Sequence, residues 1–203
     1  MSRLTQLIAG WPGLVSKPDP DLVADSLVLL PHLAGAARLV DVGSGGGLPG
    51  LALKIAKPEL QVVLVEANRR KAAFLVRAAA ELGLWGVDIV GRRAEDAGHD
   101  PDFREAFDVA TARALAPMPV LAELCLPLVR VGGRLLAMKT AGGEEVAAAE
   151  VAVKLLGGRL ASVLQAPSAA RERGEIVVVD KIAPTPPEYP RRPGVPARRP
   201  LGK

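Results

Sequence analysis

The sequence predicts an α/β fold, a doubly wound and mostly parallel sheet whose last strand is antiparallel. Short apolar runs alternate with amphipathic segments of helical period almost without exception up to residue 156, which is the pattern of βαβ units. The first apolar run ends in a glycine-rich stretch, residues 43–47, and such a turn leads from a parallel strand into a helix. The 203 residues, 49% of them hydrophobic, suit one domain with short extensions.

The first elements follow from hydrophobic spacing and from the positions of proline and glycine. Residues 1–20 are rich in turn formers, and a helix is predicted over 20–33, where apolar side chains recur at helical spacing. Residues 38–42 are a short apolar run that ends at glycines, as a buried parallel strand does. Pro49 suits the first turn of the next helix, which continues to Ala56.

The rest of the chain continues the alternation of strands and helices. Strands are predicted over 60–65, 87–90, 106–111, 134–139, 159–164 and 175–180. Helices are predicted over 69–82, where Gly83 closes the helix, and over 120–129 and 144–156. Gly132-Gly133 is predicted to turn the chain, and the last two strands are expected to form a hairpin around residues 165–174.

The charge of the chain is concentrated at its C-terminal end. We divide the sequence into an N-terminal extension with a helix (1–34), the sheet domain (35–184) and a basic, Pro-rich tail (185–203). The tail holds five Arg or Lys and one Glu, so the whole net charge of +4 lies there. Its prolines predict a linker-like segment without regular structure. Its charge indicates a polyanion, nucleic acid before membrane, although a solvated tail without a partner explains it equally well.

Several classes of protein are disfavoured by what the sequence lacks. Cys125 is the only cysteine, so no disulfide can form within the chain. We find neither a signal peptide nor an apolar run of about 18 residues, and we expect a cytoplasmic protein and a monomer. His32 and His99 have no companions at metal-ligand spacing, and no metal site is predicted.

The glycine-rich loop fits two cofactors. Gly45-x-Gly47-x-x-Gly50 formally matches the dinucleotide fingerprint, and a strand-to-helix loop of this kind can equally hold S-adenosylmethionine. Glu66 ends the second predicted strand, where either cofactor would place its ribose. A loop without a ligand is the third interpretation, but four glycines in five positions weaken a fold that gains nothing from them.

Three observations favour S-adenosylmethionine. Asp41 lies two residues before the first glycine, where a carboxylate can order the loop and face a cationic methionine group, whereas dinucleotide sites usually have an apolar residue there. Residues 92–96 follow the third predicted strand and offer a side chain and a backbone amide to an adenine edge. The alternating layers end before residue 160, which leaves no room for the substrate domain of a dehydrogenase.

Together these segments resemble the ribosomal RNA small subunit methyltransferase G family, from about Asp25 to the end of the chain. The matching residues are Asp41 to Gly50 with Leu48-Pro49-Gly50, residues 64–75, Arg93-Ala94-Glu95-Asp96, Thr111-Ala112-Arg113-Ala114, Ala137-Met138-Lys139, residues 189–196 and Lys203. Family members usually have more N-terminal helix, and they carry Arg-His where Asp21-Leu22 stand here.

The resemblance implies a class I S-adenosylmethionine-dependent methyltransferase that acts on guanine N7 of 16S ribosomal RNA, either as free RNA or within the small ribosomal subunit. The residues expected to bind the cofactor are Asp41, Gly43, Ser44, Gly45, Gly47, Leu48, Glu66, Ala67, Ala94, Glu95 and Arg113. The residues expected to bind RNA are Arg93, Lys139, Arg191, Arg192, Arg198 and Arg199.

Arg113 and Lys139 are the expected catalytic residues, and both would act by positioning. Guanine N7 has a free lone pair and no proton to lose, so no general base is expected. Arg113 would orient the guanine through O6 or a phosphate, or hold the cofactor carboxylate.

Other functions stay open on the residues alone. They are methyl transfer to another RNA or to a small molecule, nucleic-acid binding by a module with a dead cofactor site, and oxidation with a nicotinamide cofactor. A small-molecule enzyme would not need the basic tail, and the intact Asp41 and Glu66 disfavour a decayed site. Cytosine C5 transfer needs a cysteine nucleophile, whereas Cys125 lies in a predicted helix and is interpreted as a core residue.

Overall fold

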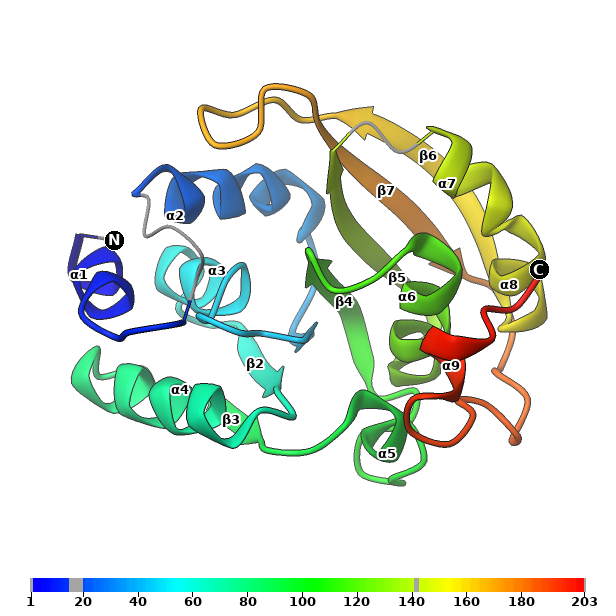
Figure 1. Ribbon diagram of the computed structural model, residues 1–203, viewed down its shortest axis with the longest axis horizontal. Helices are drawn as coiled ribbons and strands as arrows, with labels where there is room; N and C mark the ends of the chain where they lie inside the picture. Colours follow the sequence, from blue (N-terminus) through cyan, green and yellow to red (C-terminus); the bar gives the residue numbers. More distant parts are fainter. Residues whose placement is uncertain (1, 15–19, 141–142, 203) are drawn as a thin grey trace.

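A seven-stranded sheet runs through the centre of the molecule, and helices cover both of its faces (Figure 1). The computed structural model describes residues 2–14, 20–140 and 143–202. The strand order is β3-β2-β1-β4-β5-β7-β6. The strands are β1 (Arg38–Val42), β2 (Gln61–Val65), β3 (Val87–Val90), β4 (Phe107–Arg113), β5 (Val129–Thr140), β6 (Gly158–Gln165) and β7 (Gly174–Lys181).

The direction of the strands confirms the predicted sheet. β1 to β5 pair in parallel, and β7 pairs antiparallel with both β5 and β6. The order of the strands reverses between β1 and β4, because β1 to β3 extend the sheet to one side and β4 to β7 extend it to the other. Sheets of this kind bind ligands at such a switch point, beyond the carboxyl ends of the strands. The fold is therefore the doubly wound, mostly parallel sheet with an antiparallel last strand that the sequence predicts.

The helices divide between the two faces of the sheet. One face is covered by α1 (Ser2–Ala9), α2 (Asp21–Ser26), the 3-10 helix η1 (Leu27–His32), α3 (Gly50–Ala56) and α4 (Arg69–Glu81). The other face is covered by α5 (Ala94–Ala97), α6 (Met118–Cys125), the 3-10 helix η2 (Leu126–Leu128), α7 (Gly143–Ala148), α8 (Glu150–Leu155) and α9 (Val195–Arg198). None of the helices within the described ranges is long and apolar enough to cross a membrane.

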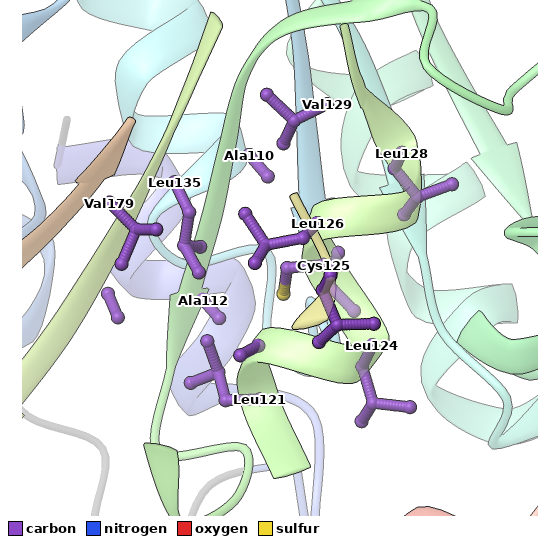
Figure 2. Close-up of a cluster of buried hydrophobic side chains, with 14 of the residues drawn as sticks. Ala110, Ala112, Leu121, Leu124, Cys125, Leu126, Leu128, Val129, Leu135 and Val179 are labelled. Carbon is purple, nitrogen blue, oxygen red and sulfur yellow. The ribbon is translucent and has the colours of Figure 1, made fainter. Parts of the chain in front are cut away.

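Alternate residues of the strands build two hydrophobic cores. In β1, Val40 and Val42 face the core beneath α6, whereas Leu39 faces the core beneath α1 to α4. Figure 2 shows the first core, where Leu121 and Leu126 pack against β4 and β5. Because both faces of β1, β2 and β4 are buried, most of their interior positions are apolar, with Asp41 and Thr111 as buried polar exceptions.

The N-terminal segment contains a helix that the sequence analysis misses. Residues 2–9 form α1, although turns are predicted over 1–20, because Leu4 and Ile8 lie one helical turn apart and are both buried. Residues 1 and 15–19 of this segment lie outside the described residues. The predicted helix over 20–33 is divided into α2 and η1.

Two other predicted helices are shorter than the spacing indicates. α6 ends at Cys125, before Pro127, whose ring nitrogen has no hydrogen to donate. The predicted helix over 144–156 is divided at Ala149 into α7 and α8. The short helix α5 follows β3 and is not predicted.

Gly132-Gly133 does not form the predicted turn, because both residues lie within β5. The register of β5 against β4 shifts between Phe107 and Val109, opposite this pair. A Cβ atom on Gly133 would lie 2.5 Å from the carbonyl oxygen of Asp108. The glycine is therefore needed for the close approach of two backbones inside the sheet.

The C-terminal tail is not linker-like, which corrects the prediction for residues 185–203. Arg191 donates from Nε and Nη2 to the buried carboxylate of Glu123 on α6, at 2.8 and 2.6 Å. Arg104 donates to the carbonyl oxygens of Thr185 and Tyr189, each at 2.8 Å. The prolines leave room for α9, and Lys203 lies outside the described residues.

We expect Arg191→Ala to lower the free energy of unfolding by about 3 kcal/mol, because it leaves the Glu123 carboxylate buried with only a backbone donor. The matched control is Arg192→Ala, which removes an exposed arginine and should change stability by less than about 0.5 kcal/mol. Urea denaturation of the wild type and both variants would measure these free energies of unfolding. Equal effects would mean that the tail does not dock through Arg191.

Candidate active site

A cavity of about 250 Å³ opens beyond the carboxyl ends of β1, β2 and β3. Six of the predicted site residues form part of its wall, namely Gly43, Glu66, Ala67, Arg93, Ala94 and Glu95. Lys71 on α4 and Arg92, which begins the segment 92–96 predicted to face the adenine, also line it. The structure therefore brings together residues from three strand ends that are distant in the chain.

The glycine loop reaches the cavity because its backbone bends where side chains do not fit. Gly43 has φ 71° and donates its N–H to Val65 O at 2.9 Å. A Cβ atom there would lie 2.5 Å from Leu115 Cδ1, so positive φ and close packing both require glycine. Farther along, Gly47 N–H donates to Ser44 O at 2.7 Å, which closes the loop.

Asp41 holds the glycine loop from inside the fold. Its carboxylate is 1% exposed and accepts hydrogen bonds from Thr111 Oγ1 at 2.9 Å and from Gly50 N–H at 3.2 Å. Burial raises the pKa of Asp41 from 3.8 to about 6, although both hydrogen bonds oppose the rise. The ordering role predicted for Asp41 is thus visible as a link between β1, β4 and the start of α3.

Glu66 holds the same loop from the cavity side. Its Oε2 accepts from Gly45 N–H and its Oε1 from Asn68 N–H, each at 2.8 Å. The side chain of Asn68 in turn caps α4 by accepting from two backbone N–H groups. Each carboxylate oxygen of Glu66 keeps a further lone pair for a ligand hydroxyl at the cavity wall.

Glu95 joins the far wall of the cavity to the C-terminal tail. Its carboxylate is 2% exposed and accepts from Arg93 at 3.1 and 3.2 Å and from Gly194 N–H at 2.9 Å. Burial raises the pKa of Glu95, but the donors outweigh it and hold that pKa below its usual range. The sequence gives no signal for Gly194, because nearly a hundred residues separate it from Glu95.

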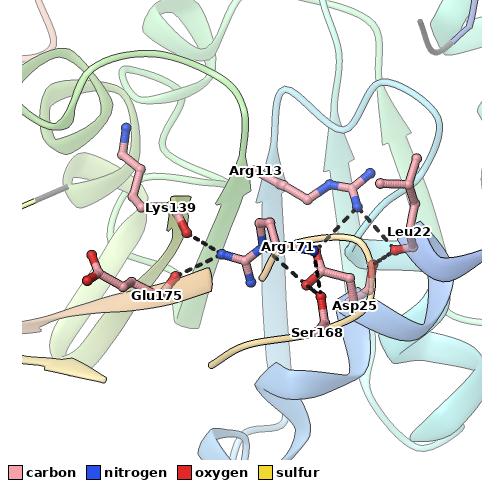
Figure 3. A network of polar contacts seen from close by, with 8 residues as sticks. Leu22, Asp25, Arg113, Lys139, Ser168, Arg171 and Glu175 are labelled. Carbon is pink, nitrogen blue, oxygen red and sulfur yellow. Dashed lines mark hydrogen bonds and ion pairs between the residues drawn. The ribbon is translucent and has the colours of Figure 1, made fainter. Parts of the chain in front are cut away.

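Arg113 and Lys139 point away from the cavity wall and are held by other elements. Arg113 Nη1 donates to Leu22 O at 3.1 Å and lies 3.8 Å from Oδ2 of Asp25, both on α2 (Figure 3). Burial lowers the pKa of Arg113, and Asp25 opposes this shift. Lys139 Nζ donates to Ala116 O at 2.8 Å and to Glu145 at 2.9 Å. The cofactor and RNA contacts expected of these two residues stay predictions.

The remaining predicted residues have structural surroundings of different kinds. Ser44 Oγ donates to Asp41 O at 2.8 Å, and Leu48 is buried in the core beneath α3. Arg198 and Arg199 are exposed on and just after α9. Cys125 is fully buried in α6, as the core interpretation predicts, and burial raises the pKa of its thiol. Among the residues that the structure describes, no three His, Cys, Asp or Glu side chains are grouped as metal ligands.

Comparison with known proteins places the chain in a family. The family described as GidB, rRNA small subunit methyltransferase G, matches residues 20–173. The chain belongs to this family. The methyltransferase G relative from Moorella thermoacetica is 48% identical over 183 residues, which are 88% of this chain and 76% of that protein. The relative from Roseiflexus sp. is 51% identical over 166 residues, which cover 81% and 71%.

Solved structures share the fold at low sequence identity. A putative O-methyltransferase from Klebsiella pneumoniae superposes with a TM-score of 0.65 at 16% identity and covers 90% of this chain and 89% of that chain. TrmN from Thermus thermophilus gives a TM-score of 0.62 at 18% identity and covers 89% and 53%. The fold is that of the class I methyltransferases.

A methyltransferase of this family takes its methyl group from S-adenosylmethionine, and the residues of the cavity wall fit that cofactor. Glu66 would accept from the two ribose hydroxyls of a bound cofactor, as acidic residues after the second strand do in such sheets. Over Gly45, an added Cβ would meet only Gly43 O at 3.8 Å, so the loop leaves open space for a ligand. Ala94 and Glu95 close the opposite wall, where the adenine would lie.

We expect the stability difference between Asp41→Asn and the wild type to depend on pH. Because the pKa of Asp41 is higher in the folded state, that state binds the proton more tightly. The wild type therefore loses stability relative to Asp41→Asn as the pH rises from about 4 to about 6, by roughly 2 kcal/mol. Urea denaturation of both proteins at pH 4, 5 and 7 measures this change, and a constant difference would contradict the raised pKa.

Proposed function

We propose that this protein transfers the methyl group of S-adenosylmethionine to guanine N7 in small-subunit ribosomal RNA. The observation that carries the proposal is the match to the methyltransferase G family over residues 20–173, together with relatives whose names specify small-subunit ribosomal RNA. The resemblance of the sequence motifs to that family supplies the guanine N7 acceptor. The cavity at the switch point of the sheet is the place where the transfer would occur.

The carboxylates around the cavity support an acceptor that has no proton to lose. Glu66 and Glu95 line the cavity, and each already accepts hydrogen bonds from N–H groups of the protein. For Glu95 these donors hold the pKa below its usual range, which weakens this carboxylate as a base. Cys125 is buried in α6 and does not reach the cavity, which disfavours covalent attack on cytosine. Guanine N7 needs neither kind of residue.

The residues of the chain would then act by binding and orientation. When bound, S-adenosylmethionine supplies an electrophilic methyl group on a sulfonium. Glu66 would hold its ribose and the glycine loop its methionine part, while Ala94 and Glu95 would hold the adenine. Arg113 would hold the RNA nucleotide at the end of β4. Placing two reactants in line can lower a barrier by roughly 7 kcal/mol or more.

The RNA surface would include exposed arginines of the docked tail. The tail has three exposed arginines, which are Arg192, Arg198 and Arg199. Their side chains can contact phosphate while the tail stays docked on the protein. Arg191 differs, because Glu123 already holds its guanidinium. Arg93 is half-exposed beside the cavity and would contact RNA close to the cofactor.

The proposed activity is tested by transfer of labelled methyl groups from S-adenosylmethionine to small subunits from cells that lack the protein, followed by mapping of the modified nucleotide. We expect label at N7 of a single guanine. Label on another RNA atom, or cofactor binding without transfer to RNA, would overturn the guanine N7 proposal. Free ribosomal RNA and assembled subunits, tested side by side, would identify the form of the substrate.

A plot of the log of the RNA binding constant against log salt has a negative slope. We expect Arg192→Ala and Arg198→Ala each to make this slope shallower by about 0.7 to 0.9, because a variant that contacts one phosphate fewer releases fewer counterions on binding. Filter binding of ribosomal RNA between 50 and 200 mM salt would measure this slope. Arg77→Ala is the matched control, since Arg77 is an exposed arginine of α4 on the opposite face of the sheet. An unchanged slope in both tail variants would exclude the tail from the RNA surface.

A further inference from the structure

The buried carboxylate of Asp25 joins segments that lie far apart in the chain. It is 1% exposed and accepts from Ser168 Oγ at 2.6 Å and from Arg171 Nε, with both carboxylate oxygens 3.1 Å away. Arg113 approaches the same group, with Nη1 3.8 Å from Oδ2 (Figure 3). Helix α2, the end of β4 and the connection between β6 and β7 therefore meet at one side chain.

Arg171 ties this carboxylate to the end of β5. Its Nη1 donates to the carbonyl oxygens of Lys139 and Glu175, the second at 3.1 Å. Its backbone N–H donates to Ser168 Oγ at 3.1 Å, so Arg171 and Ser168 hold each other and both hold Asp25. A planar guanidinium that uses several donors at once fixes direction as well as charge.

The three contacts of Asp25 differ in length, and this difference indicates which residues hold Asp25 in place and which residue Asp25 holds. Ser168 and Arg171 are within hydrogen-bond distance of Asp25, whereas Arg113 at 3.8 Å makes only an ion pair. Arg113 hydrogen-bonds instead to the backbone of Leu22 on the same helix. Asp25 is thus fixed by the β6–β7 connection, and Arg113 takes its position from Asp25 and α2.

The charges of this cluster are two arginines, Arg113 and Arg171, and two carboxylates, since Asp41 as well as Asp25 acts on Arg113. Two guanidiniums, those of Arg113 and Arg171, share one carboxylate, and their side chains are only 14% and 12% exposed. Arg171 Nη2 is buried without a hydrogen-bond partner among the described residues. Ala114 and Leu115 follow Arg113 directly and line the cavity. The guanidinium of Arg113 at the end of β4 has five N–H donors in a fork that suits a phosphate, and its hydrogen bond to Leu22 O uses one of them.

We propose that Asp25 and Arg171 are positioning residues that hold the Arg113 guanidinium in place to bind a phosphate oxygen of the RNA nucleotide that is methylated. The β6–β7 connection then belongs to the acceptor side of the site, although it contributes nothing to the wall of the cofactor cavity. This inference rests on the proposed function. The cofactor carboxylate offers the same anionic chemistry, so the experiment separates the two ligands.

The test is Asp25→Asn, which keeps the shape of the side chain and an acceptor for Ser168 but removes the charge. We expect kcat/KM for ribosomal RNA to fall at least tenfold, while the Kd of S-adenosylmethionine, measured by calorimetry, changes less than twofold. Asp180→Asn is the matched control, because it makes the same change in an exposed ion pair with Arg159 on the same hairpin. This control should keep the wild-type constants.

Two further measurements separate positioning from a purely structural role. Arg171→Lys keeps the charge and should recover part of the RNA activity that Arg171→Met loses, with rates normalised to folded protein. A crystal structure of Asp25→Asn should show the Arg113 guanidinium turned from its wild-type position. Wild-type kcat/KM in Asp25→Asn, an equal loss of cofactor affinity, or an unmoved Arg113 would each overturn the proposal. If the wild type itself methylates no RNA, the proposed function fails, and the position of Arg113 still decides this inference.

Discussion

The architecture of the site depends on one buried carboxylate, that of Asp41. Its two oxygens accept from Thr111 on β4 and from the first residue of α3, Gly50. A Cβ atom on Gly50 would lie 2.4 Å from Leu64 Cδ2, so only glycine brings this N–H close enough to donate. The strand order places β4 beside β1, and the hydrogen bonds of Asp41 join these two strands to the glycine-rich loop and the start of α3.

The other carboxylates of the site extend the same principle, because each joins a cavity wall to a distant element. Glu66 joins the glycine loop to the start of α4, and Glu95 joins the short helix after β3 to the C-terminal tail. Carboxylates that accept from backbone N–H groups are anchors with fixed geometry, and the lowered pKa of Glu95 makes that group a weak base. A site built in this way suits transfer to an atom that already has a free lone pair, where orientation supplies the catalysis.

The docked tail changes how the basic end of the protein is understood. A flexible basic linker would bind RNA independently of the cofactor site. Here Gly194 donates to Glu95 and Arg191 pairs with Glu123, so the exposed arginines belong to a segment that is fixed to the cavity wall at Glu95. The burial of Glu123 requires that Arg191 and the tail stay docked, because a carboxylate at 0% exposure needs a cation close by.

The sequence alone determines the order of strands and helices, the glycine loop, Asp41, Glu66 and the family, because these depend on local patterns of hydrophobicity and on short motifs. Only the tertiary structure decides where long side chains point. Arg113, Lys139 and Arg191 all belong to recognisable motifs, yet each is held by a partner that local spacing does not indicate, from Glu145 nearby in the chain to Leu22 and Glu123 at distances of 91 and 68 residues. The same reason applies to Gly132-Gly133. The two glycines predict a turn by themselves, but in the structure they lie within β5, where the backbone of β4 approaches Gly133 closely. Contacts between distant segments form only once the sheet has brought those segments together, and no local pattern records them.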